Sequence, residues 1–536
     1  MKRFVLPASI ALISLWTFQQ AHYLPAVYFG KPVLTATIAA VLILSALLYR
    51  NKKIHPLIER YLDGSFLGRL SPIAGAIALL VLLPVRRMEE PPIGPGDSFH
   101  LIEFIPVFSE VYGYLSTPDE LLALFVRSKV FLLLQNLTDA QNAIGLYSYF
   151  AGVVHLIAVF FFLKNRPDWK SGWLILFFTP VMALYAGYVE SYSMARALLF
   201  VTIVLGWVSL NQPPGSARNR LVVATAAVAA IAVLHHLLAG LILPALAYMV
   251  WKISDGRVKA FLRRSTVAAV VGICILSVVY AGFYLSSQSS LVFADSHVGT
   301  DGMLPAGKLF SKDNLSKMAG LLFITPAFLI TLLSKRLSGT KNDRDAAIRR
   351  FLWIATGPFL FHAFLWNAAI GMPADWDLFT FFAIPLSLLV YHDLSRVQIY
   401  STVRAAVLPL LTVLPAILWL HWLNETTPAT LENRQYISYV RTTVIPALKE
   451  DRRLSQLPLK RQKMYLRLRL FEEKAGYRMR QMPASGERQK AEQNLAQGMQ
   501  IFHSGLLESD AAYERKIIEA QKYLFPVYQF LQRQNQ

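Results

Sequence analysis

Two aspartates flank a tryptophan in the segment Asp375-Trp376-Asp377, directly before an apolar stretch. An Asp-x-Asp pair can bind a divalent cation such as Mg²⁺ or Mn²⁺, and the cation can neutralise phosphate charge. The sequence therefore predicts Asp375 and Asp377 as metal ligands and Trp376 as a residue that stacks on a sugar ring. The alternative is that the two acids cap the following helix, whose N-terminus favours negative charge.

A third acid, Asp97, comes directly after the Pro- and Gly-rich segment 91–96. His100 and Glu103 follow it at i+3 and i+6, so we expect both to contact a substrate near Asp97 if a helix begins there. The plainer interpretation of Asp97 is a helix N-cap, a position that Asp favours.

The short turn Tyr188–Tyr192 joins two apolar segments and holds Glu190 and Arg196 close to the bilayer surface. Glu190 could assist a catalytic base or bind sugar hydroxyls, and Arg196 could hold a phosphate by bidentate hydrogen bonds. Tyr188 and Tyr192 could stack on a sugar, or they could belong to the aromatic belt at the interface. An ion pair between Glu190 and Arg196 that closes the turn is the alternative.

Two adjacent histidines, His235 and His236, occupy another tight turn. Histidine can donate to a phosphate or ligate a metal. Adjacent side chains rarely converge on one ion, so contact with phosphate or sugar is the preferred interpretation. The loop at 287–317 carries Lys308, Lys312 and Lys317, which could meet a pyrophosphate, although pairing with lipid head groups is the favoured alternative.

The elements that must position these residues are apolar. The chain has 536 residues, of which 55% are hydrophobic and 16% charged, a composition typical of a polytopic membrane protein. Cys274 is the single cysteine, which excludes an intramolecular disulfide and a cysteine-rich zinc site. The net charge of +20 is interpreted as a sign of membrane topology, and no nucleic-acid partner is expected.

Lys and Arg concentrate in every second loop between the apolar segments. The positive-inside rule then places the N-terminus in the cytoplasm, with the first segment interpreted as an uncleaved span and not as a signal peptide. All the candidate site residues fall in the other set of loops, so we expect one composite site on the outer face. The predicted spans, about thirteen, are 4–20, 32–49, 70–85, 142–163, 171–188, 194–210, 220–234, 237–251, 265–286, 318–334, 350–370, 377–391 and 403–422.

Two polar regions flank this bundle in the prediction. The first outer loop, 86–141, contains the stretches 101–115 and 121–134, which we expect to be helices lying along the interface with their apolar faces down. Arg127 and Lys129 would be costly in a span. The tail, 424–536, is charged and punctuated by proline, with helices expected at Leu459–Ala475 and Gly486–Phe525. We expect it to be an extracytoplasmic helical domain that caps the structure or docks a protein partner.

An acid just after the first outer turn, followed by interfacial helices, resembles the GT-C glycosyltransferases. The stretch Asp375–Phe379 is similar to an Asp-Trp-Asp-Leu-Phe pattern in bacterial membrane proteins with GT-C-like layouts. The resemblance implies an all-α polytopic bundle over residues 1–423 and Asp97 as the catalytic base. It also implies an inverting transfer of sugar from a polyprenyl-phosphate or pyrophosphate carrier to a lipid, glycan or protein acceptor. Many relatives carry two adjacent acids, whereas Ser98 follows Asp97 here.

Three other functions remain open from the sequence. A transporter or flippase for a polyprenyl-linked substrate would place polar groups near the midplane, often in inverted repeats, and the polar residues here cluster at one face. An O-antigen polymerase or ligase typically relies on arginine-rich outer loops. An assembly scaffold would depend on its tail and not on Asp97 or Asp375. The expected location in every case is the bacterial inner membrane.

Overall fold

The computed structural model of the chain describes residues 97–166, 169–189, 191–285, 302–324, 343–367, 378–395, 412, 416 and 435–534. Nearly all of the regular structure in these ranges is helical, as the sequence predicts. The one pairing of strands among the described residues is short: β1 (Gly302–Met303) lies antiparallel to β2 (Trp366–Asn367).

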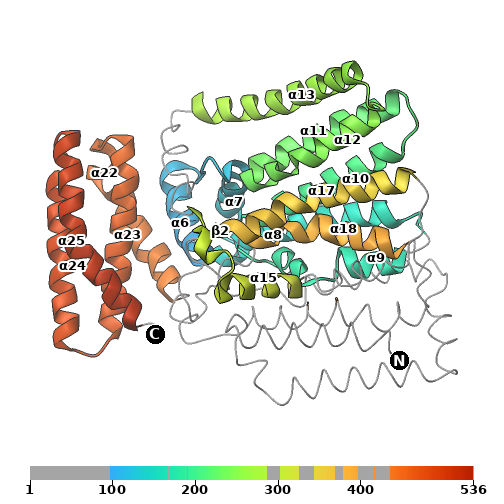
Figure 1. Cartoon of the computed structure of the whole chain (residues 1–536). Coiled ribbons are helices and arrows are strands. Elements are labelled where there is room, and N and C mark those ends of the chain that lie inside the picture. Colours follow the sequence, from blue (N-terminus) through green and yellow to red (C-terminus); the bar gives the residue numbers. More distant parts are fainter. Residues whose placement is uncertain are drawn as a thin grey trace, which may run out of the picture.

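The helices of the main bundle run side by side (Figure 1). Their interior is close-packed and apolar; for example, Phe351 and Leu389 have no exposed surface. Gly206 allows one close approach, because a Cβ atom there would lie 2.7 Å from the ring of Phe351. The helices of the bundle include α8 (Ala140–Leu163), α10 (Tyr192–Asn211), α11 (Ser216–His235), α12 (Leu243–Ile253), α13 (Val258–Leu285), α17 (Asp343–Leu365) and α18 (Ala383–Leu394).

Four helices of the described structure are long and apolar enough to cross a membrane: Ala140–Leu163, Tyr192–Asn211, Ser216–His235 and Val258–Phe283. They coincide with four of the predicted spans. The fourth presents its apolar side chains outward, and Ile273 and Val278 are 60% and 71% exposed, as expected where the surrounding solvent is lipid. The protein is therefore a helical membrane protein. The predicted spans 4–20, 32–49 and 70–85, and most of 318–334 and 403–422, lie outside the described residues.

One predicted span is broken in the structure. The stretch predicted at 171–188 forms α9 (Trp169–Leu176) and then, after a turn, the 3₁₀ helix η1 (Pro180–Tyr185). Pro180 explains the break, because proline has no N–H group and its ring clashes with the preceding helical turn. Two other predicted spans begin with 3₁₀ turns, η2 (Leu237–Ile242) before α12 and η4 (Leu378–Phe382) before α18.

Basic side chains gather where α8, α12 and α18 end and α13 and α17 begin. Arg264 donates from Nη1 to the Ile253 carbonyl at 3.2 Å. Arg349 donates from Nε to Asp393 Oδ1 at 3.0 Å, and the Arg166 guanidinium lies 4.1 Å from the ring centre of Phe162. We call this the basic end of the bundle. It corresponds to the loops that the charge pattern assigns to the cytoplasm.

The opposite end of the bundle carries α6 (Asp97–Tyr112) and α7 (Leu121–Leu134). The bounds of α7 are those predicted. Its two basic residues differ in environment: Arg127 is fully buried, whereas Lys129 is exposed and donates from Nζ to the Gly113 carbonyl at 2.8 Å. Beside this end lies a segment that contains the 3₁₀ helix η3 (Ala306–Lys308) and α15 (Lys312–Ile324).

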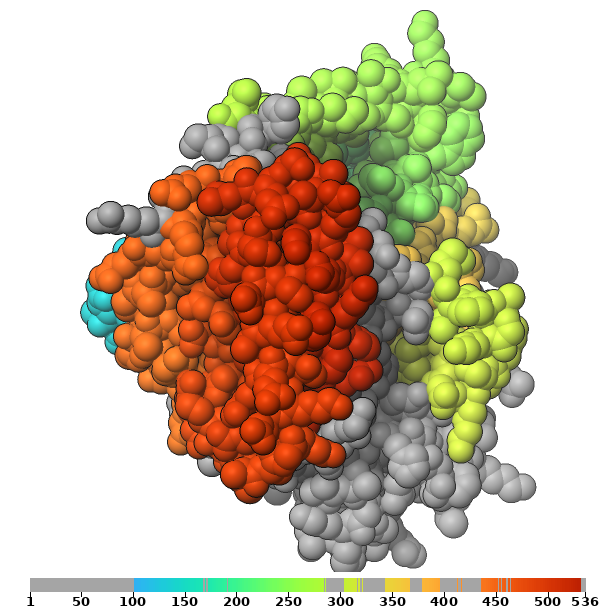
Figure 2. Space-filling view, turned by 90° about the vertical axis from the view of Figure 1, so that its left-hand side faces the viewer, coloured from blue at the N-terminus to red at the C-terminus, as the bar shows by residue number. Residues whose placement is uncertain are grey.

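The C-terminal helices stand across the end that carries α6 and α7, and their axes run crosswise to the bundle (Figure 1). Figure 2 looks onto this end and shows the orange and red helices covering much of it. The helix predicted at Gly486–Phe525 is instead a hairpin, because the chain turns at 506–509. The elements are η5 (Val440–Val444, a π-helical turn), α21 (Ile445–Glu450), α22 (Arg452–Gln456), α23 (Leu459–Gln481), α24 (Gly486–Gly505) and α25 (Asp510–Gln534).

Candidate functional site

Three of the turns predicted on the outer face meet in the structure. The ring of Tyr192, at the start of α10, lies 4.8 Å from the ring of His236, between α11 and η2. Both rings contact Phe381 of η4, at 6.1 Å and 5.7 Å between centroids. The guanidinium carbon of Arg196 lies 4.6 Å from the Phe381 ring centre. These contacts bring together Tyr192, Arg196 and His236, which the sequence predicted as parts of one site.

A fourth element contributes a carboxylate that the sequence analysis missed. Glu120, directly before α7, accepts a hydrogen bond from the Ser191 hydroxyl, and its Oε1 lies 3.7 Å from His236 Nε2. Locally, Glu120 looks like an ordinary acid before a helix, and its partners come from distant turns. We call Glu120, Tyr192, Arg196, His236 and Phe381 the turn cluster.

The orientation of the His236 ring follows from its backbone contact. The Leu238 N–H donates to His236 Nδ1 at 3.1 Å, so Nδ1 must be the unprotonated nitrogen and Nε2 carries the hydrogen. Burial, with the nearby Arg196 and His362, lowers the pKa of His236 to about 3. His236 is thus a neutral hydrogen-bond donor whose N–H lies on the side of the Glu120 carboxylate.

This shift in the pKa of His236 predicts a loss of stability in acid. Because the folded value lies below the unfolded value of about 6.5, the unfolded chain binds the proton first as the pH falls below 6.5. Between pH 7 and pH 5, His236 should reduce the free energy of unfolding by up to about 2 kcal/mol. The measurement is chemical unfolding of the wild type and His236→Gln in mild detergent at both pH values. Equal losses in the two proteins would contradict the assignment.

The side chain of His235 contacts different residues from those that His236 contacts. Its Nδ1 lies 2.7 Å from the Tyr147 hydroxyl, and the Arg127 guanidinium lies 4.7 Å from the Tyr147 ring centre. The two neighbouring histidines therefore do not converge on one point. Within the described residues, no group of three His, Cys, Asp or Glu side chains could hold a metal ion.

The start of α10 is fixed by close backbone packing. Gly187 has φ +84°, in the left-handed region that glycine favours, and its carbonyl lies only 2.7 Å from where a Cβ atom on Gly145 would stand. The next carbonyl, of Tyr188, accepts a hydrogen bond from Ser148. The side chain of Tyr188 is 7% exposed. Glu190, two residues further on, lies outside the described residues.

A second cation lies at the same end, in the loop whose lysines the sequence favours as partners of lipid head groups. Lys317 of α15 is 7% exposed and donates from Nζ to the Trp366 carbonyl at 3.0 Å. It lies 4.7 Å from the ring centre of Phe379, two residues before the Phe381 of the turn cluster. His362 stacks on Trp366 at 5.3 Å. The proximity of Lys317 and His362 has no mark in the sequence, because the two residues lie far apart in the chain and on helices with different local patterns.

Other predicted site residues have side chains that lie outside the described part of the structure. Asp97 and His100 form the first turn of α6, and their side chains lie outside the described set. Asp375, Trp376 and Asp377 also lie outside the described residues, although the η4 helix that follows them supplies Phe381. Glu103 is buried elsewhere, against Tyr436 of the C-terminal region.

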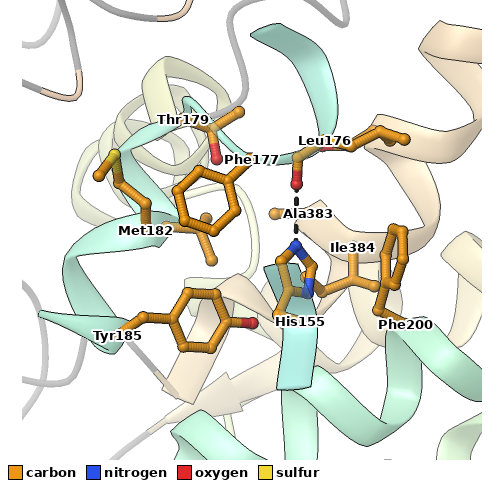
Figure 3. A pocket seen from close by; sticks show the side chains of 11 residues that line it. His155, Leu176, Phe177, Thr179, Met182, Tyr185, Phe200, Ala383 and Ile384 are labelled. Carbon is orange, nitrogen blue, oxygen red and sulfur yellow. Dashed lines mark hydrogen bonds between the residues drawn. The ribbon is translucent and has the colours of Figure 1, made fainter. Parts of the chain in front are cut away.

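A small cavity inside the bundle lies apart from these residues (Figure 3). Its walls are mostly apolar and aromatic, and its ≈ 10 Å³ is about the space of one water molecule. His155 projects into it and binds the Leu176 carbonyl at 2.9 Å, so its Nε2 carries the hydrogen. Tyr185 stacks on the imidazole at 5.0 Å. The cavity is too small for a sugar or a lipid, and His155 is a packed core residue.

No protein-family model matches the sequence, and no curated protein matches it. Among solved structures, ArnT from Cupriavidus metallidurans bound to undecaprenyl phosphate aligns with 14% identity and a TM-score of 0.38. The alignment covers 87% of this chain and 77% of ArnT. The apo state of the same protein gives the same values. At this level of similarity the match carries no argument about the activity of this chain.

Proposed function

We propose that this protein is a membrane glycosyltransferase that moves a sugar from a polyprenyl-phosphate or pyrophosphate carrier to a lipid, glycan or protein acceptor. The observation that supports it is the turn cluster: a buried arginine, a neutral histidine donor and a carboxylate meet at one end of an apolar bundle. An anionic head group on a lipid chain would need hydrogen-bond donors such as Arg196 and His236 at the end of a bundle that is surrounded by lipid. The site would work on the extracytoplasmic face of the inner membrane, opposite the basic end.

In the proposed reaction, the acceptor hydroxyl oxygen attacks the anomeric carbon of the sugar and a new C–O bond forms. The bond between that carbon and the carrier phosphate oxygen breaks, and its electron pair leaves with the phosphate. Asp97 accepts the hydroxyl proton as general base, and the configuration at the anomeric carbon inverts. Glu190 would assist the base or hold sugar hydroxyls.

The remaining residues would bind the two substrates. Arg196 and His236 would donate hydrogen bonds to the phosphate as negative charge develops on it. Contacts with the sugar and the acceptor would come from His100, Tyr188, Tyr192, His235 and Trp376, whereas Glu103 is buried against Tyr436 and is left out of the binding site. The C-terminal helices would lie on the same side of the membrane and could also receive a protein partner.

A metal requirement is a separate expectation. Asp375 and Asp377 would hold a divalent cation, Mg²⁺ or Mn²⁺, that neutralises phosphate charge. Removing metal with EDTA should then lower transfer by about 10²-fold or more, and added Mg²⁺ or Mn²⁺ should restore it. The assay is initial transfer rate before and after chelation, with Asp375→Asn beside the wild type. A wild-type rate that EDTA leaves unchanged would rule out the metal.

The experiment that tests the proposal separates chemistry from transport. Purified protein is placed in proteoliposomes with fluorescent polyprenyl-linked sugars and a mixed acceptor extract. A transferase changes the covalent structure of the donor, which chromatography detects. A flippase changes only the leaflet in which the donor lies, which a membrane-impermeant quencher detects. Leaflet exchange with intact donor would overturn the proposal in favour of transport.

A further inference from the structure

The helix that begins at Asp97 shares its hydrophobic core with the C-terminal helices. Ile105 and Phe108 of α6 are at most 2% exposed, and they belong to the same buried cluster as Val440 and Leu470. The sequence alone predicts that this apolar face lies on the membrane. In the structure these residues are buried in protein, because the tail folds back over the first outer loop.

A buried polar contact joins the same two parts. The Tyr436 hydroxyl donates to Glu103 Oε1 at 2.8 Å, and the two residues are 2% and 3% exposed. Burial raises the pKa of Glu103, while Lys474, the Tyr436 hydrogen bond and Arg478 act in the opposite direction. A buried carboxyl group is costly when it loses a hydrogen-bond partner. The contact therefore favours one orientation of α6 against the C-terminal helices.

Two contacts nearer the surface tie the same C-terminal segment to the end of α6 and to α7. Lys449 pairs with Glu110, close to the end of α6. Arg441 donates from Nη2 to the Gln135 carbonyl at 2.8 Å, at the end of α7. The exposed Lys449 pair should contribute little by itself. Together with the shared core, these contacts pack α6 between the bundle and the C-terminal helices.

We infer that Tyr436 and Glu103 are positioning residues, which fix α6 so that the group at its first turn faces the reaction site. This inference rests on the proposed function, in which Asp97 is the general base. Glu103 acts through Tyr436 and lies six residues after Asp97, on the same helix. The C-terminal helices then set turnover without contacting the donor.

The test compares two tyrosines in the full-length protein. Tyr436→Phe removes the hydroxyl that binds Glu103. Tyr439→Phe is the matched control, because the Tyr439 hydroxyl binds Glu473 within the C-terminal helices at 2.8 Å. Tyr436→Phe should lower kcat about tenfold with KM for the donor unchanged, and amides of residues 97–112 should exchange hydrogen about tenfold faster. Tyr439→Phe should change neither quantity more than about twofold.

A conservative change at the partner gives the rescue. Glu103→Gln keeps an oxygen that accepts from Tyr436, so α6 should keep its protection and its activity, whereas Glu103→Leu should behave like Tyr436→Phe. Wild-type exchange of α6 in Tyr436→Phe, or equally faster exchange in α10 and α11, would overturn the inference. Hydrogen exchange needs no substrate. If the wild type transfers no sugar, the proposed function fails, and the exchange data still decide whether this pair holds α6.

Discussion

Asp97→Asn should abolish most sugar transfer, lowering kcat by about 10²–10⁴-fold, the usual contribution of a general base. Asparagine has nearly the same shape and still suits the start of a helix. Its amide cannot take up the proton from the hydroxyl group of the acceptor substrate. Binding of the donor should change little. The measurement is the initial rate of transfer by purified protein, with donor affinity measured separately.

Asp139→Asn is the matched control for this substitution. Asp139 also stands at the start of a helix in the first outer loop, where its side chain accepts from the Asn142 N–H at 2.8 Å. Asparagine keeps that capping role, so this variant should transfer sugar at the wild-type rate. Equal rates in the Asp97→Asn protein and the wild type would remove Asp97 from the mechanism.

Arg196→Gln should lower kcat/KM by about 10²-fold, comparable to the loss of one donor to developing negative charge. The side chain is fully buried, and its guanidinium lies against Phe381 beside His236. Arg196→Lys should recover only part of the activity, because an ammonium group lacks the planar fork that binds phosphate through two hydrogen bonds. Rates should be compared with thermal unfolding of the same samples in detergent.

Arg166→Gln provides the control at the basic end of the bundle. Arg166 also lies against aromatic rings, 4.1 Å from Phe162 and 5.0 Å from Trp207, but it is at the opposite end of the helices. Its loss should also cost stability, and it should leave kcat/KM of the folded protein near the wild-type value. A similar fall in kcat/KM for both variants would mean that Arg196 acts only through packing.

The grouping of the outer turns could be predicted because it depends on two local properties of the sequence, the hydropathy of each segment and the charge of each loop. Hydropathy locates the spans, and alternating Lys and Arg density assigns each turn to a side. Tyr192, Arg196 and His236 were placed together in this way, and the structure brings them into contact. The helix at 121–134 was recognised because Arg127 and Lys129 are costly in a span.

Other contacts depend on the tertiary arrangement and could not be read from local pattern. Glu120 meets Ser191 across 71 positions, and Glu103 meets Tyr436 across 333. Neither pair has a spacing that marks it in the sequence. Pro180 marks the break in the predicted span 171–188. A hydropathy value is a mean over many residues, so a single proline changes it little. Asp97 and Asp375 stay predictions, because their side chains lie outside the described structure.

The most direct test of the central claim is the stoichiometry of a single reaction with purified protein. Mass spectrometry would follow a polyprenyl-linked sugar and its acceptor in detergent. We expect one sugar-free carrier phosphate to appear for each glycosylated acceptor, and neither product with Asp97→Asn. Unchanged donor in the presence of folded wild-type protein, across a panel of sugars and both phosphate lengths, would contradict glycosyl transfer as the function of this protein.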